Sequence, residues 1–184
     1  MADPTLVRDN LFQLNVLLWA CLPQPASAPV TPVLLNAGYG LWSVEQQLNA
    51  GVAELARLRS AAVDIQPNPV VDAVLHQNAR REYVLVECKP TSFGVGSGWS
   101  PQARGLIVAG GNAASRLGLS GRLRAETYYL VPADDATATD KTLVELANEV
   151  VTAGFAACPT GPLGLSVRAD GAYLGLSAAP AGNG

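Results

Sequence analysis

The sequence predicts an α/β fold in which helices flank a mixed β-sheet. Two apolar strand patterns, at 70–77 and 82–89, lie too close together for a crossover helix and therefore predict an antiparallel hairpin. Helical patterns separate this hairpin from further strand patterns, an alternation typical of an α/β protein. With 184 residues and 49% apolar content, the chain can bury one core, so we expect a single main domain.

The N-terminal residues are set apart by their composition. Residues 3–21 predict a helix or a long apolar element, and the prolines between 23 and 32 favour an extended connection after it. This element either docks on the domain or serves as an interface. We therefore divide the chain into the N-terminal element with its proline-rich connection (1–36), a main domain (37–177) and a tail or linker (178–184).

Charge and cysteine content narrow the class of protein. The first residues form neither a basic leader with an apolar core nor a span of about 20 apolar residues, so we expect a soluble cytoplasmic protein. The three cysteines are widely spaced, which argues against structural zinc and against a disulfide scaffold. The net charge of −3 argues against nucleic-acid binding by bulk charge. Residues 80–124, however, carry seven basic and two acidic side chains, a local net charge of +5.

Two helices are predicted on either side of the hairpin. Ser43 and Gln46 form a capping-box pattern, and an apolar stripe follows to about residue 60. Ser100 and Pro101 are typical N-cap and first-turn residues of a second helix, which Gly118 would stop after residue 117.

The C-terminal part predicts a strand, a helix and a second hairpin. The strand pattern covers 125–131, and the amphipathic helix covers 140–153 with Gly154 after it. Asp170-Gly171 between two apolar runs is a type I′ turn signal. The predicted order is helix, hairpin, helix, strand, helix, hairpin.

Two carboxylates are predicted to face each other in the first hairpin. A turn at 78–81 places Asp72 directly across from Glu87, and Lys89 lies two residues along on the face of Glu87. Directly opposed like charges destabilise an antiparallel pair. One carboxylate must hold a proton, or Lys89 must neutralise the pair, or a divalent cation must bind between them. Hard oxygen ligands with room for water suit magnesium.

These residues resemble the PD-(D/E)xK nuclease superfamily, which has a restriction-endonuclease-like fold. The resemblance rests on Asp72, a gap of fourteen residues, and Glu87-Cys88-Lys89 at the end of an apolar strand between two helices. It covers roughly residues 43–131 and implies an αβββαβ core. The sequence departs from the family pattern in having Val-Val before Asp72 and no clear first strand, unless residues 61–66 supply it.

The resemblance implies a role for each site residue. Asp72 and Glu87 would hold magnesium, for which manganese can substitute, and Lys89 would serve the attacking water. A glutamate on the preceding helix often completes the metal shell, which points to Glu45. The following helix often contributes polar side chains, which points to Gln102 and to Arg104.

The expected function is that of a magnesium-dependent nuclease acting on nucleic acid, most simply DNA. The resemblance alone connects such domains with restriction, phage defence or repair. Cleavage of both strands would favour a homodimer. The alternative is a catalytically inactive restriction-endonuclease-like module that binds a protein partner or scaffolds an assembly, as the acidic composition and apolar N-terminal element also allow.

Overall fold

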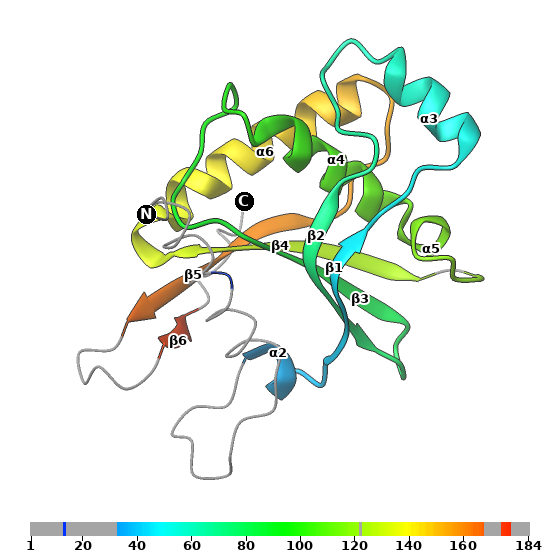
Figure 1. Cartoon of the computed structure of the whole chain (residues 1–184). Coiled ribbons are helices and arrows are strands. Elements are labelled where there is room, and N and C mark those ends of the chain that lie inside the picture. Colours follow the sequence, from blue (N-terminus) through cyan, green and yellow to red (C-terminus); the bar gives the residue numbers. More distant parts are fainter. Residues whose placement is uncertain (1–12, 14–32, 122, 168–173, 178–184) are drawn as a thin grey trace, which may run out of the picture.

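The fold is built on one mixed sheet of six strands in the order β1-β2-β3-β4-β5-β6 (Figure 1). The computed structural model describes residues 13, 33–121, 123–167 and 174–177. Strands β1, β2 and β3 are antiparallel, β3, β4 and β5 are parallel, and β6 runs antiparallel to β5. The predicted mixed α/β class is therefore confirmed. The strands are β1 (Gly40–Gln47), β2 (Val70–Gln77), β3 (Glu82–Cys88), β4 (Arg124–Pro132), β5 (Thr160–Val167) and β6 (Leu174–Ser177).

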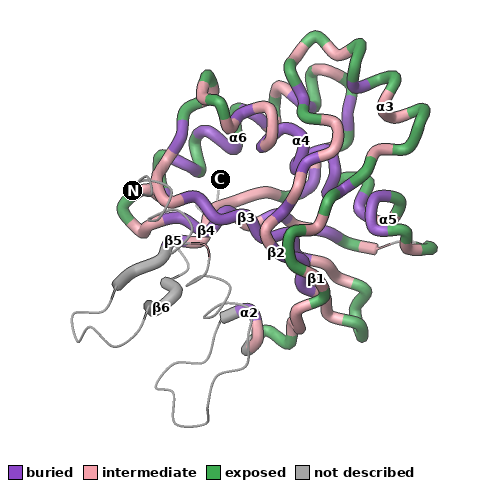
Figure 2. The backbone as a smooth tube through the Cα atoms, in the orientation of Figure 1, coloured by how far each residue is buried: buried purple, intermediate pink, exposed green. Residues whose placement is uncertain are grey.

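Helices α4 and α6 pack side by side on one face of the sheet (Figure 1). The larger apolar core lies between this face and the two helices, and it contains Leu85, Leu106 and Leu146. A smaller cluster lies on the opposite face, where Val84 and Val86 contact Leu34 of α2. The central strands are consequently buried on both faces (Figure 2). The described helical segments are α2 (Val33–Asn36), α3 (Val52–Arg59), α4 (Ser100–Gly111), α5 (Ala113–Arg116), the 3-10 turn η2 (Ala133–Asp135) and α6 (Ala136–Thr152).

The predicted helix over 43–60 is wrong in its first half. Gly40–Gln47 forms the edge strand β1, paired with β2, and the helix begins only at Val52. Pairing with the apolar strand β2 satisfies the backbone of this segment, and that tertiary interaction outweighs the local capping pattern. The first strand that the sequence did not reveal is therefore at 40–47, whereas residues 61–66 form an irregular connection.

The other predicted elements need smaller changes. Strands 70–77 and 125–131 are confirmed within one residue at each end, and the strand predicted at 82–89 ends at Cys88. The helix predicted from Ser100 to residue 117 is interrupted at Asn112, which separates α4 from α5.

The C-terminal helix and hairpin also form. Helix α6 begins four residues earlier than predicted and stops at Gly154, whose φ of +84° is the left-handed conformation that glycine adopts readily. Strands β5 and β6 form the predicted antiparallel pair. The proposed Asp170-Gly171 turn, the tail at 178–184 and the N-terminal element at 3–21 (apart from Gln13) lie outside the described residues.

Small residues in α4 set how closely this helix approaches its neighbours. A Cβ at Gly110 would overlap the sulfur of Cys158, and a Cβ at Gly105 would overlap the carbonyl oxygen of Gln66. Glycine at these two positions lets α4 lie against the segments that hold it over the sheet. Helix α4 also begins next to Lys89, a polar residue of the candidate site.

None of the described helices is long and apolar enough to cross a membrane.

Candidate functional site

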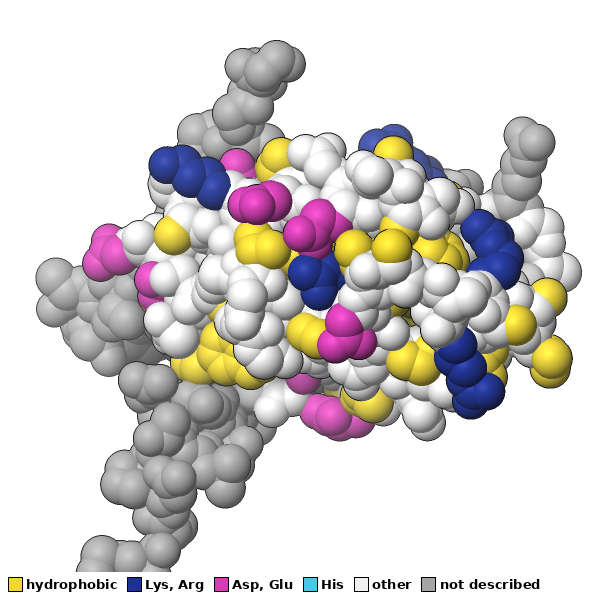
Figure 3. All heavy atoms as spheres, turned by 90° about the horizontal axis from the view of Figure 1, so that it is seen from above, with side chains coloured by type: hydrophobic (Ala, Val, Ile, Leu, Met, Phe, Trp, Pro, Cys, Tyr) yellow, Lys and Arg dark blue, Asp and Glu magenta, His cyan; other side chains and the backbone are white. Residues whose placement is uncertain are grey.

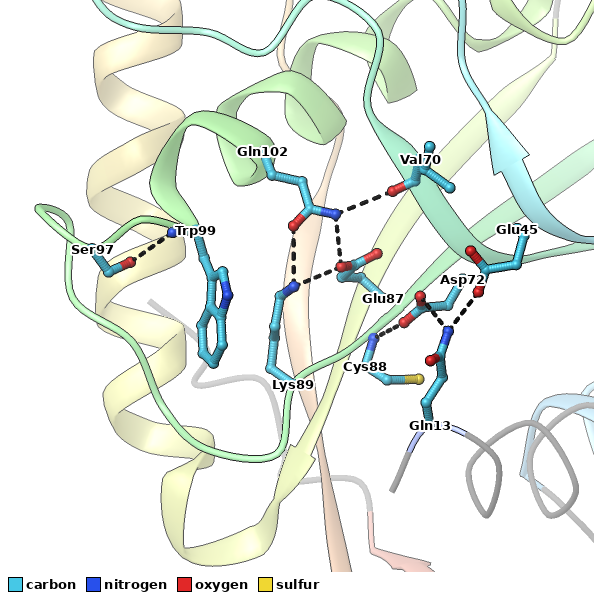
Figure 4. A network of polar contacts seen from close by, with 10 residues as sticks. All are labelled: Gln13, Glu45, Val70, Asp72, Glu87, Cys88, Lys89, Ser97, Trp99 and Gln102. Atoms are coloured by element: carbon cyan, nitrogen blue, oxygen red, sulfur yellow. Dashed lines mark hydrogen bonds and ion pairs between the residues drawn. The ribbon is translucent and has the colours of Figure 1, made fainter. Parts of the chain in front are cut away.

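The candidate site lies where strands β2 and β3 meet the start of α4. In the observed register Ala73 pairs with Val86, which is the register predicted from the sequence. Asp72 and Glu87 therefore occupy the next opposed positions of the two strands. Lys89 follows the end of β3, and Gln102 lies in the first turn of α4. Figure 4 shows these side chains converging from β2, from β3 with the residue after it, and from α4.

Glu87, Lys89 and Gln102 form a closed hydrogen-bonded triangle. The Lys89 ammonium donates to Oε1 of Glu87 at 2.8 Å and to Oε1 of Gln102 at 3.1 Å. The amide nitrogen of Gln102 donates to the same Glu87 oxygen at 2.9 Å, and to the carbonyl of Val70 at 3.2 Å. Gln102 thus fixes both ends of the ion pair, and the rotamers of the three side chains depend on one another.

Glu87 is the most perturbed carboxyl of the site. It is 2% exposed, and its burial raises the pKa to about 7, although the charge of Lys89 opposes this effect. Asp72 raises it further by like-charge repulsion. Within the described part of the chain, Oε2 of Glu87 is buried without a hydrogen-bond partner. A buried carboxylate with one oxygen unsatisfied is a position at which a proton or a cation would be stabilised.

Asp72 is held by a backbone group of the neighbouring strand. The Cys88 amide donates to Oδ2 at 2.6 Å, which favours the ionised carboxylate. Burial nevertheless has the larger effect and raises the pKa of Asp72. The sequence left open three ways to relieve the repulsion between the opposed carboxylates. Lys89 bonds Glu87 directly, yet burial keeps the pKa values of both carboxyls raised, so the lysine does not fully offset the cost of burying the two charges.

Glu45 reaches the site from a different element than the sequence suggested. It lies on strand β1, between Val44, which pairs with Ala73, and Gln46, which pairs with Val71. The helical position predicted for Glu45 is therefore wrong, but its place across from Asp72 keeps it close to the other carboxylates. Its φ of +48° is the left-handed region, which residues with a Cβ rarely adopt.

Gln13 is the site residue that the sequence analysis missed. Its amide nitrogen donates to Oε1 of Glu45 at 2.6 Å and to Oδ1 of Asp72 at 2.8 Å. It is separated from Asp72 by 59 positions. No motif in the sequence marks one glutamine within a mostly apolar segment, so only tertiary structure reveals this contact.

Two aromatic side chains close the site beside Lys89. The Lys89 ammonium lies 4.9 Å from the centre of the Trp99 ring, a cation–π contact. Phe93 packs against Trp99 and is buried in the main core. Phe93 therefore serves the core, whereas Trp99 is half-buried next to a charged site residue.

The described arginines of the positively charged middle segment do not gather around the carboxylates. Arg104 pairs with Glu149 at 2.7 Å and donates to the carbonyl of Asp64, so it joins α4 to its neighbours instead of entering the site. Arg116 is buried and pairs with Glu54. Arg124 lies beside Glu82, at the opposite end of β3 from Glu87. Figure 3 shows one face of the molecule, on which the acidic side chains lie toward the centre and left and most of the basic side chains lie toward the right.

Comparison with known proteins gives little further information. No protein-family model matches the chain, and no curated protein matches it. A search of solved structures finds the structure of Pyrococcus furiosus SfsA in complex with Ca2+, with 14% sequence identity and a TM-score of 0.39. The match covers 79% of this chain and spans 56% of that one. At this level of similarity the match carries no argument, and the functional conclusion rests on the site itself.

Proposed function

We propose that the chain is a magnesium-dependent nuclease of the PD-(D/E)xK type, which hydrolyses phosphodiester bonds in nucleic acid. The observation that carries this proposal is the arrangement of Asp72, Glu87 and Lys89 on adjacent strands, with both carboxyl pKa values raised and one lysine bound to Glu87. Two incompletely compensated carboxylates fit a divalent cation with hard-oxygen preference. Manganese is the expected substitute for magnesium.

Each side chain has a defined task in this proposal. Asp72 and Glu87 would hold the metal, and Glu45 would add a carboxylate from β1. When bound, the metal would supply Lewis-acid activation of the phosphodiester and of a water molecule. Lys89 orients the attacking water through its ammonium group, which Gln102 and Trp99 hold in place. Water attack on phosphorus with departure of the opposite ester oxygen leaves two products, a phosphate end and a hydroxyl end.

DNA is the proposed substrate, and restriction, phage defence or repair is the proposed context through the family resemblance. A homodimer would allow both strands of a duplex to be cut. The second candidate function is an inactive module that binds protein. The burial of Arg104 and Arg116 in internal ion pairs favours this candidate, since these arginines are then withheld from a phosphate backbone.

A plasmid-nicking assay with magnesium or manganese separates the two candidates. We expect nicking by the native chain that Glu87→Gln and Lys89→Met abolish, because these variants keep side-chain size but remove the negative charge of the carboxylate and the ammonium. Glu145→Gln, at an exposed position of α6, is the matched control and should leave nicking unchanged. Absence of cleavage by the native chain on duplex, single-stranded and RNA substrates would support the protein-binding module.

Metal binding can be measured without a substrate. A ligand that binds only the folded chain stabilises it by about 2.7 kcal/mol at 100 times its Kd. Magnesium should therefore raise the melting temperature of the native chain, and Asp72→Asn should remove that increase. An inactive module would be indifferent to magnesium in both forms.

A further inference from the structure

The amide of Gln13 occupies the space between two carboxylates of the site. Its nitrogen donates to Oε1 of Glu45 at 2.6 Å and to Oδ1 of Asp72 at 2.8 Å, and Figure 4 shows the three side chains pointing toward one another. The other Asp72 oxygen accepts from the Cys88 backbone amide. One neutral amide thus donates hydrogen bonds to two carboxylates. It lies where a cation would be attracted by both negative charges.

The backbone of Glu45 supports a specific role for this contact. A left-handed φ in a residue with a side chain is unfavourable and persists only where the surroundings enforce it. Glu45 adopts this conformation within a strand, and its carboxylate meets Gln13 and the neighbourhood of Asp72. The strained residue is therefore one whose side chain enters the candidate metal centre.

The described acidic side chains do not by themselves make up a three-ligand metal site. Among residues 33–121 and the other described segments, His, Cys, Asp and Glu side chains form no group of three or more that could hold a metal ion. A glutamine carbonyl is a hard oxygen donor of the kind that magnesium and calcium accept. Rotation of the terminal amide by half a turn exchanges its nitrogen and oxygen, so the same side chain can present either to its surroundings.

We propose that Gln13 is a further oxygen ligand of the metal centre, in addition to Asp72, Glu87 and Glu45. Without a cation the amide nitrogen faces the two carboxylates, and with a cation the amide turns its oxygen inward. This inference rests on the proposed function, because it presupposes that the site takes a divalent cation. It assigns a ligand to a part of the chain 59 positions before Asp72.

Titration of the full-length chain with magnesium or calcium, in the absence of nucleic acid, tests the assignment. Isothermal titration calorimetry should show Gln13→Ala binding the metal at least about ten-fold more weakly than the native chain, since loss of even an outer-shell partner costs this much. Gln13→Glu keeps an oxygen donor at this position and should restore binding. Gln46→Ala, a glutamine of β1 whose amide bonds the neighbouring backbone, is the matched control and should bind normally.

The direction of the change separates the possible results. Tighter binding by Gln13→Ala would mean that the amide blocks the site, and equal binding would mean that it is uninvolved; either result overturns the assignment while the proposed metal centre stands. No metal binding by the native chain would overturn both. Melting temperatures in chelator, compared between native and Gln13→Ala, check that a loss of affinity does not reflect unfolding.

Discussion

Replacing Glu87 by glutamine should make the protein more stable at alkaline pH, although this glutamate is the proposed metal ligand. Burial raises the pKa of Glu87 from an ordinary value of 4.5 to about 7, so the carboxyl is protonated in the folded state and ionised in the unfolded state between these values. The free energy of unfolding therefore falls as the pH rises through this window and is constant above it. The full loss is on the order of 3 kcal/mol.

Glutamine mimics the protonated carboxyl at every pH. It keeps an oxygen that can accept from Lys89 and Gln102, the two donors to Oε1 in the native site. The difference in unfolding free energy between Glu87→Gln and the native chain should thus be near zero at pH 4.5. It should rise to about 3 kcal/mol in favour of the variant at pH 8.

Urea denaturation of both chains at several pH values between 4.5 and 8, in metal-free buffer with chelator, measures this difference. Titrating groups far from Glu87 affect both chains alike and cancel in the comparison. Glu145→Gln, at an exposed position of α6, is the control and should differ from the native chain by less than about 0.5 kcal/mol at every pH. A Glu87→Gln difference that does not change with pH would refute the claim that burial dominates the ionisation of Glu87.

Three further predictions concern the metal centre and the packing of α4. Magnesium affinity should fall by up to about ten-fold per pH unit below pH 7, because the proton on Glu87 competes with the metal. Calorimetry at pH 6 and 8 measures this change, and a pH-independent affinity would argue against Glu87 as a ligand. Lys89→Ala should destabilise the chain by about 3–5 kcal/mol at pH 8, because it leaves the buried carboxylate of Glu87 unpaired. A variant that unfolds at nearly the same urea concentration as the native chain would contradict this. Gly110→Ala should lower the free energy of unfolding by about 1–3 kcal/mol or more, since its Cβ would overlap Cys158. Gly51→Ala, where a Cβ meets nothing, is the control and should change stability little. Equal melting temperatures of the two variants would show that α4 is not so closely packed.

The hairpin and its charged residues were predictable from the sequence. Alternation along β2 and β3 depends on the local period of two residues, and a short turn leaves few possible registers. The shared face of Glu87 and Lys89 follows from that period, and the opposition of Asp72 to Glu87 follows from the turn length. The parts of the fold that local pattern determines, including the strand at 124–132 and the stop of α6 near Gly154, were accordingly found within a few residues.

Long-range pairing decided what the sequence could not. The segment around Ser43 has a capping-box pattern, but hydrogen bonds to a strand some 30 positions away make it β1. Gln102 and Arg104 share one helical turn and looked equivalent, yet the packing of α4 directs the first to Glu87 and the second to Glu149.

By itself, the sequence determined the α/β class, the central hairpin and the presence of two opposed carboxylates beside a lysine. Tertiary structure alone decided that Glu45 enters the site from a strand and that Gln13 joins it. It also decided that Arg104 and Arg116 of the middle segment pair elsewhere, with Glu149 and Glu54. The physical reason is that side-chain alternation and helix stops act between near neighbours, whereas a site assembled from distant segments depends on how strands pair and helices pack.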